Sequence, residues 1–211
     1  VLIPSGLDLQ QFKNLPSKTV ARDQLETPEN ALTFGLLGRF DLQKGQLLLL
    51  EAMRLAENKH FHVVLLGEPT MGEGLDYFEK MKRLIQENNL EHRVHIRPFM
   101  KSPEIFYKAM DWFVMATKAE TFGMVTIESL ACGTPVLGSD AGGTPEILEN
   151  QTGGLLFESL NATDLAAKID RIISEKIAFE PNSLKEIAAK YDHKRICEQA
   201  ENHLKLTQNN D

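Results

Sequence analysis

The sequence contains few residues of the kinds that build disulfide frameworks or metal sites. Its two cysteines, Cys132 and Cys197, stand far apart among 211 residues, in segments with helix-like patterns. This spacing indicates neither a zinc site nor a disulfide framework, so we expect both to be reduced thiols. The six histidines show no metal-ligand spacing. The sequence therefore predicts that the protein holds no metal and lies in a reducing, cytoplasmic compartment.

Long apolar runs and an excess of positive charge are also lacking. No segment approaches the roughly 20 apolar residues that a transmembrane helix needs, and no signal-peptide pattern is visible. A formal net charge of −7 argues against nucleic-acid binding and weakens a membrane-surface role for this domain. Because the chain begins without Met inside an apolar segment, we expect a fragment whose missing partner is an N-terminal domain.

Short apolar runs alternate along the chain with segments of helical periodicity. The runs span residues 32–37, 62–66, 94–96, 112–115, 135–138 and 155–157. Helices are predicted at 44–57, 75–88, 102–110, 124–131, 145–148, 161–174, 181–191 and 194–206. This alternation predicts an α/β fold with a Rossmann-like, doubly wound and mainly parallel sheet of about six strands. Residues 7–30 are polar and poor in periodicity, so no regular element is predicted there.

A loop with two cations joins the first predicted strand to its helix. Gly38 lets the backbone turn tightly at the strand end. Arg39 and Lys44 flank the helix N-terminus, where backbone N–H groups already favour an anion. Arg39 can hold a phosphate through two parallel hydrogen bonds, whereas Lys44 acts as a point charge. The loop GRFDLQKG therefore suits a diphosphate.

Two carboxylates eight residues apart follow the fourth predicted strand. Glu120 lies in the loop, and Glu128 lies one turn into the next helix, on the face shared with Met124 and Val125. Gly123 allows a ligand to approach the backbone closely, and the N–H groups of the first helical turn can hold a phosphate. An ionised Glu128 suits the two vicinal hydroxyls of a ribose, which are both donors.

Two further glycine-bearing loops follow predicted strands. Loops at the carboxyl ends of parallel strands form the ligand crevice of an open sheet, which places Glu120 and the Gly142–Gly143 pair on one edge. The segment at 67–74 is glycine-rich and could line a nucleotide site. It lacks the dinucleotide fingerprint, so we predict mainly a turn.

Several of these segments, in this order, resemble the donor-binding half of the retaining family 4 (group 1) glycosyltransferases of GT-B fold. The matching motifs are ETFG from Glu120, the second Glu at 128, ACGTPV from Ala131, GGTPE from Gly142 and the GRFDLQKG loop. The resemblance covers nearly the whole chain. It implies an interdomain segment at 1–30, a nucleotide-sugar-binding domain at 31–190 and a C-terminal helix at 191–211 that can pack on the N-terminal domain.

The resemblance also implies roles for individual residues. Arg39 and Lys44 would bind the donor diphosphate and, with Gly38 and the amides of residues 123–125, stabilise the charge of the leaving group. Glu128 would bind the ribose. Glu120 would hold the hydroxyls of the donor sugar, and whether it also stabilises the oxocarbenium-like centre stays open.

Other positions near the donor are assigned by the same resemblance. Thr121 and Phe122 are placed beside the sugar, and Arg97 is placed beside the nucleotide. The corner after the third strand usually carries a glycine in this family and contacts the base through backbone groups. Here Pro98 replaces that glycine and has no N–H to donate, which departs from the family pattern.

The predicted function is the donor half of a metal-independent hexosyltransferase. A UDP- or GDP-sugar is the expected donor, no separate cofactor is expected, and the acceptor and any membrane contact belong to the missing N-terminal domain. We expect the fragment to bind the donor but to turn over poorly. The alternatives are a non-catalytic nucleotide-sugar-binding module, a GT-B sugar-nucleotide epimerase and, less favoured, a nicotinamide-dependent dehydrogenase. The base, sugar and acceptor are left open.

Overall fold

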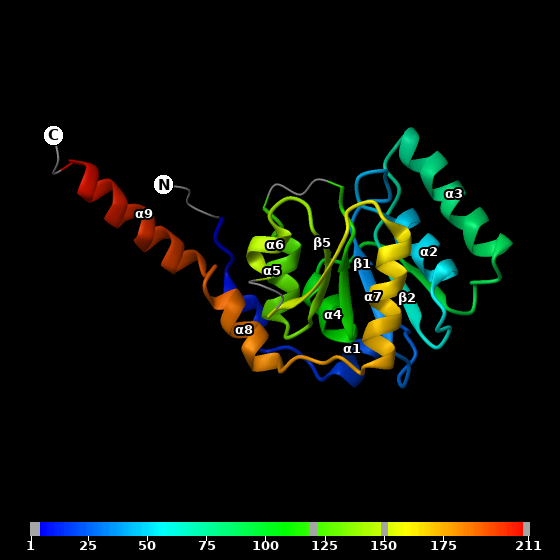
Figure 1. Cartoon of the computed structure of the whole chain (residues 1–211). Helices are drawn as coiled ribbons and strands as arrows, with labels where there is room; N and C mark the ends of the chain where they lie inside the picture. Colours follow the sequence, from blue (N-terminus) through cyan, green and yellow to red (C-terminus); the bar gives the residue numbers. More distant parts are fainter. Residues whose placement is uncertain (1–4, 119–121, 149–151, 209–211) are drawn as a thin grey trace.

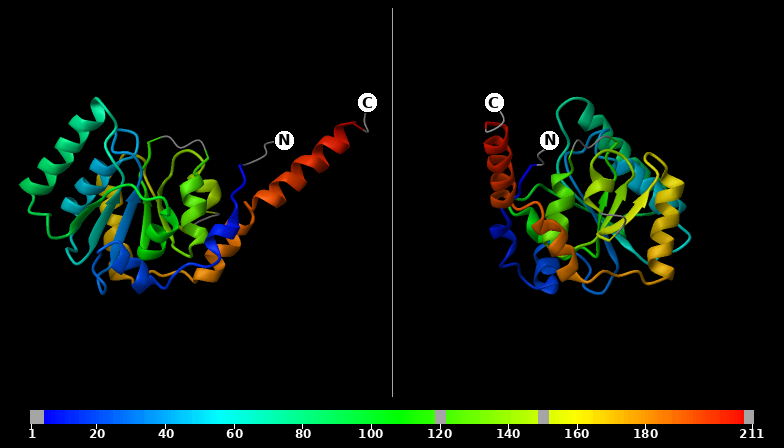
Figure 2. Two further views of the ribbon diagram at one scale, coloured as in Figure 1. Left: turned by 180° about the vertical axis from the view of Figure 1, so that it is seen from behind. Right: turned by 60° about the vertical axis from the view of Figure 1, so that its left-hand side comes forward.

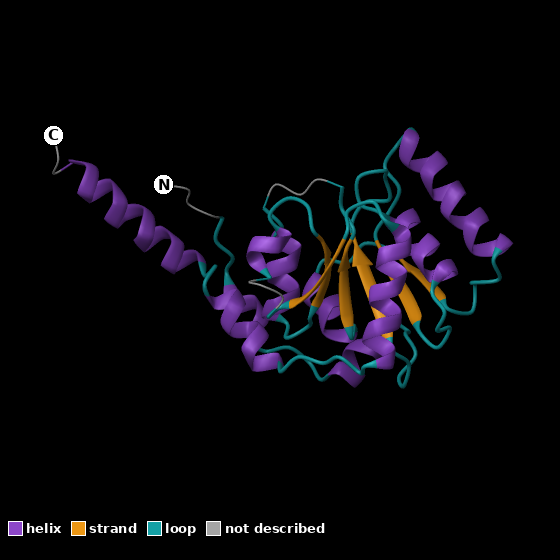
Figure 3. Cartoon of the chain, viewed as in Figure 1, coloured by secondary structure: helices purple, strands orange, loops and turns teal. Residues whose placement is uncertain are grey.

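The computed structural model describes residues 5–118, 122–148 and 152–208 of the chain. Within these residues a six-stranded sheet has the order β3-β2-β1-β4-β5-β6. Figure 3 draws the strands of this sheet in orange, between the helices. Every ladder between neighbouring strands is parallel. The strands are β1 (Thr33–Leu37), β2 (His62–Leu66), β3 (Val94–Arg97), β4 (Trp112–Met115), β5 (Val136–Ser139) and β6 (Gly154–Phe157).

Helices cover both faces of the sheet (Figure 1, Figure 2). One face carries α2 (Gln46–Leu55), α3 (Glu73–Glu87) and α7 (Ala162–Ser174). The other carries α1 (Lys18–Gln24), α4 (Pro103–Ala109), α5 (Met124–Ala131), α6 (Thr144–Ile147) and α8 (Pro181–Ala189). The predicted doubly wound, Rossmann-like α/β fold is therefore confirmed.

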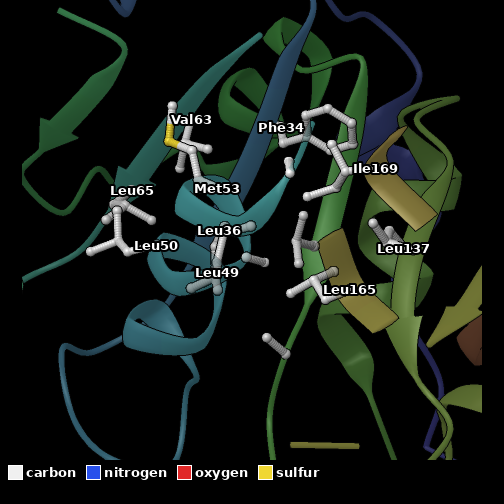
Figure 4. Close-up of a cluster of buried hydrophobic side chains, with 14 of the residues drawn as sticks. Phe34, Leu36, Leu49, Leu50, Met53, Val63, Leu65, Leu137, Leu165 and Ile169 are labelled. Carbon is white, nitrogen blue, oxygen red and sulfur yellow. The ribbon is translucent and has the colours of Figure 1, made fainter. Parts of the chain in front are cut away.

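Side chains of each strand alternate between two apolar layers. In β2, Val63 and Leu65 join the layer under α2 and α7, which Figure 4 shows in close-up. Val64 and Leu66 join the layer under α4 and α5. Because a parallel strand is covered on both faces, both sets must be apolar, and the strand appears in the sequence as a continuous apolar run. The ends of all six predicted strands differ from the observed ends by at most one residue.

The order of the strands reverses between β1 and β4 at the centre of the sheet. Their ladder has two residue pairs, Phe34 with Trp112 and Gly35 with Phe113. The ladder between β1 and β2 has five. The crossover connections leave these two central strands toward opposite faces, to α2 and to α5. Such a switch point opens a crevice at the carboxyl ends of the strands.

Two elements lie where the sequence predicted none: a 3₁₀-helix at Leu9–Phe12 and helix α1. Helix α1 has no long apolar stripe. It begins at the N-cap residue Ser17, whose hydroxyl accepts a hydrogen bond from Val20 N at 3.3 Å, and it is tied to the sheet through Arg22 and Asp111. Periodicity could not reveal a helix held mainly by a cap and by charges.

The chain's last described helix, α9 (His193–Gln208), extends away from the sheet (Figure 1). It starts beside the N-terminal segment, because Leu7 N donates to Tyr191 O at 2.8 Å and His193 N donates to Leu7 O at 3.0 Å. The segments that enter and leave the sheet domain therefore lie side by side. The predicted packing of this helix on an N-terminal domain stays a prediction, as do the predicted domain boundaries.

Candidate functional site

A pocket of about 450 Å³ opens at the carboxyl ends of β1 and β2. Gly38, Arg39 and Lys44 line it from the β1–α2 loop, and Val125 lines it from the first turn of α5. These four residues were predicted as phosphate ligands from two segments far apart in the sequence. The structure brings them together at the edge where open parallel sheets bind ligands.

The backbone of the β1–α2 loop, which carries Arg39 and Lys44, is fixed by contacts within the loop and with α2. Gly38 has φ +151°, and a Cβ on it would meet Lys44 Cγ and Cδ at 3.3 Å, so the lysine stem lies against this glycine. Arg39 has a side chain that is 65% exposed, with Nε 3.5 Å from Asp41 Oδ2. Buried Gln46 donates from Nε2 to Arg39 O at 2.8 Å. These contacts fix the backbone of the loop and leave the Arg39 guanidinium accessible to an anion.

The same loop contacts the segment that follows β4. Gly45 has φ +79°, and a Cβ on it would lie 2.3 Å from Ala116 O. Lys118 N donates to Gln43 O at 3.3 Å. The segment leading to Glu120 therefore starts against the β1–α2 loop. Glu120 and Thr121 themselves lie outside the described residues, so their predicted sugar contacts stay predictions.

The turn into α5 has the predicted backbone. Gly123 is its N-cap, with φ +92°, and Met124 and Val125 follow, half-buried, in the first turn. Phe122 directs its ring toward Tyr191, with ring centroids 5.8 Å apart in an edge contact. Its side chain thus joins an apolar layer, which does not favour the predicted contact of this ring with a sugar.

The loop after β5 lies against this turn. A Cβ on Gly143 would lie 2.6 Å from Phe122 O, so the backbones of the two loops are in contact. The sequence places the Gly142–Gly143 pair on the same edge as the loop after β4. The close approach of Gly143 to Phe122 agrees with that placement and leaves no room for a side chain at position 143.

Glu128 lies one turn into α5, is not among the residues that line the pocket, and is bound from α4. Its Oε2 accepts a hydrogen bond from the Tyr107 hydroxyl at 2.8 Å. Burial raises the pKa of the Glu128 carboxyl, the Tyr107 hydrogen bond lowers it, and the charge of Glu104 raises it. Burial and the nearby Glu128 charge hold the pKa of the Tyr107 hydroxyl well above its usual range. Tyr107 was not predicted as a site residue, and its signal in the sequence is a hydroxyl within an otherwise apolar helix face.

Arg97 is not part of this pocket. Its Nε donates to Leu25 O and its Nη2 to Glu26 O, each at 2.7 Å. The guanidinium thereby holds the end of the N-terminal segment in a neighbouring hollow, which Pro98 also lines. The geometry does not favour the predicted nucleotide role of Arg97. Phe99, which is 64% exposed, lines the pocket from the same corner.

The β2–α3 loop supplies a wall of the pocket that was predicted mainly as a turn. Gly67, Glu68, Pro69 and Thr70 all line it. This loop is joined to the β1–α2 loop, because Phe40 N donates to Glu68 O at 2.8 Å. The glycine-rich composition of residues 67–74 was the available signal for this wall.

A hollow of about 490 Å³ lies at the amino-terminal ends of the strands, lined by Leu32, Trp112 and Pro135 among others, and includes none of the predicted site residues.

In the described part of the chain, no three side chains of His, Cys, Asp or Glu form a group that could hold a metal ion. None of the helices described is long and apolar enough to cross a membrane.

A protein-family model described as "Glycosyl transferases group 1" matches residues 17–191. The chain belongs to this family. One curated relative of this group 1 domain is the D-inositol 3-phosphate glycosyltransferase of Streptomyces bingchenggensis, 29% identical over 182 residues. The match covers 82% of the chain and 40% of that relative. The chain thus spans less than half the length of the curated relatives it matches.

Solved structures of glycosyltransferases share the fold. The group 1 domain superposes on Anabaena Alr3699/HepE in complex with UDP with a TM-score of 0.86 and 28% identity, covering 95% of this chain and 56% of that one. It also matches the C-terminal domain of the group 1 protein LpcC from Francisella tularensis, with a TM-score of 0.71 and 23% identity. That match covers 92% of this chain and 98% of that domain. The predicted GT-B fold is confirmed.

Proposed function

We propose that this group 1 domain is the donor-binding half of a retaining, family 4 hexosyltransferase. The donor is a UDP- or GDP-sugar, and the acceptor is held by an N-terminal domain of the same protein. The observation that carries the proposal is the pocket in which Arg39 and Lys44 meet the first turn of α5. The 28% identity to a protein crystallised with UDP supports a nucleotide as its ligand.

The pocket is suited to a leaving diphosphate. Breaking a sugar–phosphate bond develops negative charge on the diphosphate and positive charge on the anomeric carbon. Arg39, Lys44 and the backbone amides after Gly123 would offset the negative charge, in a setting where preorganised donors act strongly. We propose that these groups supply the stabilisation that a divalent cation gives in other transferases, so that transfer needs no metal.

Two carboxylates complete the proposed donor site. Glu128 would accept hydrogen bonds from the ribose hydroxyls, and Glu120 would hold the donor sugar together with Thr121. We propose that transfer takes place in the cytoplasm, in polysaccharide biosynthesis, and that any contact with a membrane is made by the N-terminal domain.

Calorimetric titration with UDP, GDP, ADP and NAD tests the proposal. One uridine or guanosine diphosphate should bind, and Glu128→Ala should weaken it by about 10-fold or more, as expected for lost hydrogen bonds to a charged group. Glu87→Ala, at the exposed end of α3, is the matched control and should leave the affinity unchanged. Binding of NAD without UDP or GDP would contradict the proposal.

Binding alone does not distinguish a transferase from an epimerase or a binding module. Product analysis of the intact protein, supplied with the nucleotide-sugar whose diphosphate binds, separates the three. Transfer releases the diphosphate and leaves the sugar on an acceptor with its anomeric configuration retained. Epimerisation changes the sugar, and a binding module leaves the donor intact.

A further inference from the structure

We propose that Tyr107 is a positioning residue of the nucleotide site, whose hydroxyl holds the Glu128 carboxylate in the orientation that receives the ribose. The inference rests on the proposed function, because it takes Glu128 to be the ribose ligand. Tyr107 belongs to α4 and is fully buried, so it acts through Glu128 and does not touch the nucleotide.

The tyrosine ring is held from several sides. Tyr107 is 0% exposed. Its ring makes edge contacts with Phe106 and Phe113, with centroids 5.8 and 5.1 Å apart. Its backbone carbonyl accepts a hydrogen bond from the Thr134 hydroxyl at 2.8 Å. A ring fixed in this way places its hydroxyl at one point, and the hydroxyl at that point donates to Glu128 Oε2.

Glu128 needs such a partner more than most glutamates do. Its side chain has three rotatable bonds and could adopt several rotamers along the surface of α5. Burial also penalises its charged form. A donor that binds the ionised carboxylate opposes both effects, because it selects one rotamer and favours the charge that accepts hydroxyl protons.

The two oxygens of the Glu128 carboxylate have different roles in the proposal. Tyr107 engages Oε2, so we expect Oε1 to be the oxygen turned toward the ribose. An ionised carboxylate offers about four lone-pair positions, enough for the tyrosine and two ribose hydroxyls together. Among the described residues, the other titratable groups that interact electrostatically with this carboxylate are Glu104 of α4 and Cys132 at the end of α5. Neither bears a positive charge that could replace the tyrosine.

Tyr107→Phe removes the hydroxyl oxygen and keeps the ring. The measurement is calorimetric titration with whichever of UDP, GDP or ADP binds the unaltered chain, and with its 2′-deoxy counterpart. The unaltered chain should prefer the ribonucleotide by about 10-fold, the scale of a hydrogen bond to a charged group. Tyr107→Phe should lower this preference to roughly threefold or less while changing the affinity for the deoxynucleotide little.

Thr134→Val is the matched control. It deletes the hydroxyl that binds the Tyr107 carbonyl and so loosens the same helix contact without touching Glu128. The preference for the ribonucleotide should survive this change. If Tyr107→Phe weakens both nucleotides equally, or if Thr134→Val erodes the preference as much, then Tyr107 is only a packing residue and the proposal is overturned.

The pH profile of the preference gives a readout that packing would not move. Without the Tyr107 hydrogen bond, the pKa of Glu128 rises, because the bond lowers it in the unaltered chain. On acidification, Tyr107→Phe should therefore lose the preference at a higher pH than the unaltered chain does. An unshifted profile contradicts the positioning role.

The two proposals can fail separately. If the unaltered chain shows a ribose preference that Glu128→Gln removes and Tyr107→Phe keeps, the donor-site proposal stands and the role of Tyr107 is overturned. If the unaltered chain and the intact protein bind none of the three diphosphates, both proposals fail.

Discussion

The Asp111 carboxylate accepts a hydrogen bond from the Arg22 guanidinium at 2.6 Å, although 89 residues separate the two in sequence. Arg22 has a side chain that is only 7% exposed. Asp111 also accepts from Thr33 N at 2.7 Å and pairs with Lys18. One carboxylate therefore ties helix α1 to the starts of β1 and β4.

Asp111→Asn should destabilise the domain. The change leaves the nearly buried Arg22 without its carboxylate, and we expect the free energy of unfolding to fall by about 2 kcal/mol, less than for a fully buried pair because Asp111 is partly exposed. Urea unfolding measures the loss. Arg54→Ala, which breaks the exposed Glu51–Arg54 pair, is the control and should change stability little. If the two variants lose equal amounts of unfolding free energy, the contacts of Asp111 with Arg22, Thr33 and Lys18 contribute no more to stability than an exposed ion pair does.

Gly67→Ala should damage both stability and nucleotide binding. Gly67 has φ +151°, and its added Cβ would lie 2.1 Å from Gly38 O. Relief of this clash must move the Gly38 backbone, so the affinity for the diphosphate should fall along with the melting temperature. Calorimetric titration and thermal unfolding measure the two effects.

Gly72→Ala is the control for the Gly67 variant. Gly72 also has positive φ, at +72°, but its added Cβ would meet no atom of the described residues within 4 Å. Only the backbone strain remains, about 1 kcal/mol. Nucleotide affinity should be unchanged. A Gly67→Ala variant that binds the diphosphate normally would show that the Gly38 backbone is not needed for the site.

Arg39→Ala should weaken binding of the diphosphate and spare binding of the nucleoside. Loss of a charge-assisted phosphate contact predicts a drop in affinity of about 10-fold to 100-fold. Arg39→Lys should recover part of it, because the charge returns without the two parallel hydrogen bonds. Titration with the nucleoside diphosphate that binds the unaltered chain, and with the matching nucleoside, separates the two parts of the ligand. Arg83→Ala, exposed on α3, is the control, and a similar loss there would indicate a general charge effect.

Stability should fall as the pH drops below 6.5. His62 Nδ1 and His95 Nε2 lie 3.0 Å apart on neighbouring strands. Burial lowers the pKa of both rings, and the charges of Arg93 and His92 lower that of His62, while those of His62 and Arg97 lower that of His95. On acidification, these two histidines therefore bind protons at a higher pH in the unfolded chain than in the folded one. Stability is lost as the pH falls from the histidine pKa of the unfolded chain through that of the folded chain.

Urea unfolding between pH 8 and pH 5 measures this loss. His95→Gln should flatten the dependence of the unfolding free energy on pH in this range. His60→Gln, which alters an exposed histidine, should leave it unchanged. An unaltered slope in His95→Gln would show that the acid sensitivity arises elsewhere.

The strands and the cationic loop could be predicted because their signals are local. β2 is a continuous apolar run, and the Gly38, Arg39 and Lys44 pattern sits between a strand and a helix. The features that were missed depend on partners distant in sequence. Nothing near Arg97 reveals that its donors are taken by the carbonyls of Leu25 and Glu26.

Helix α1 and Tyr107 were missed for the same reason. The helix is held by a carboxylate in another part of the chain, and the tyrosine acquires its partner only when α4 packs beside α5. A local pattern can predict an element or a loop. It cannot predict which polar group will meet which after the chain has folded.

The short ladder between β1 and β4 has a consequence for the order in which the protein folds. Its two residue pairs join strands that are far apart in the sequence, whereas β1 and β2 are close enough to pair early along five positions. Pairings between distant segments require the costly closure of a long loop and form slowly. Because the pocket takes its walls from both sides of this junction, we expect it to be among the last features to form as the protein folds.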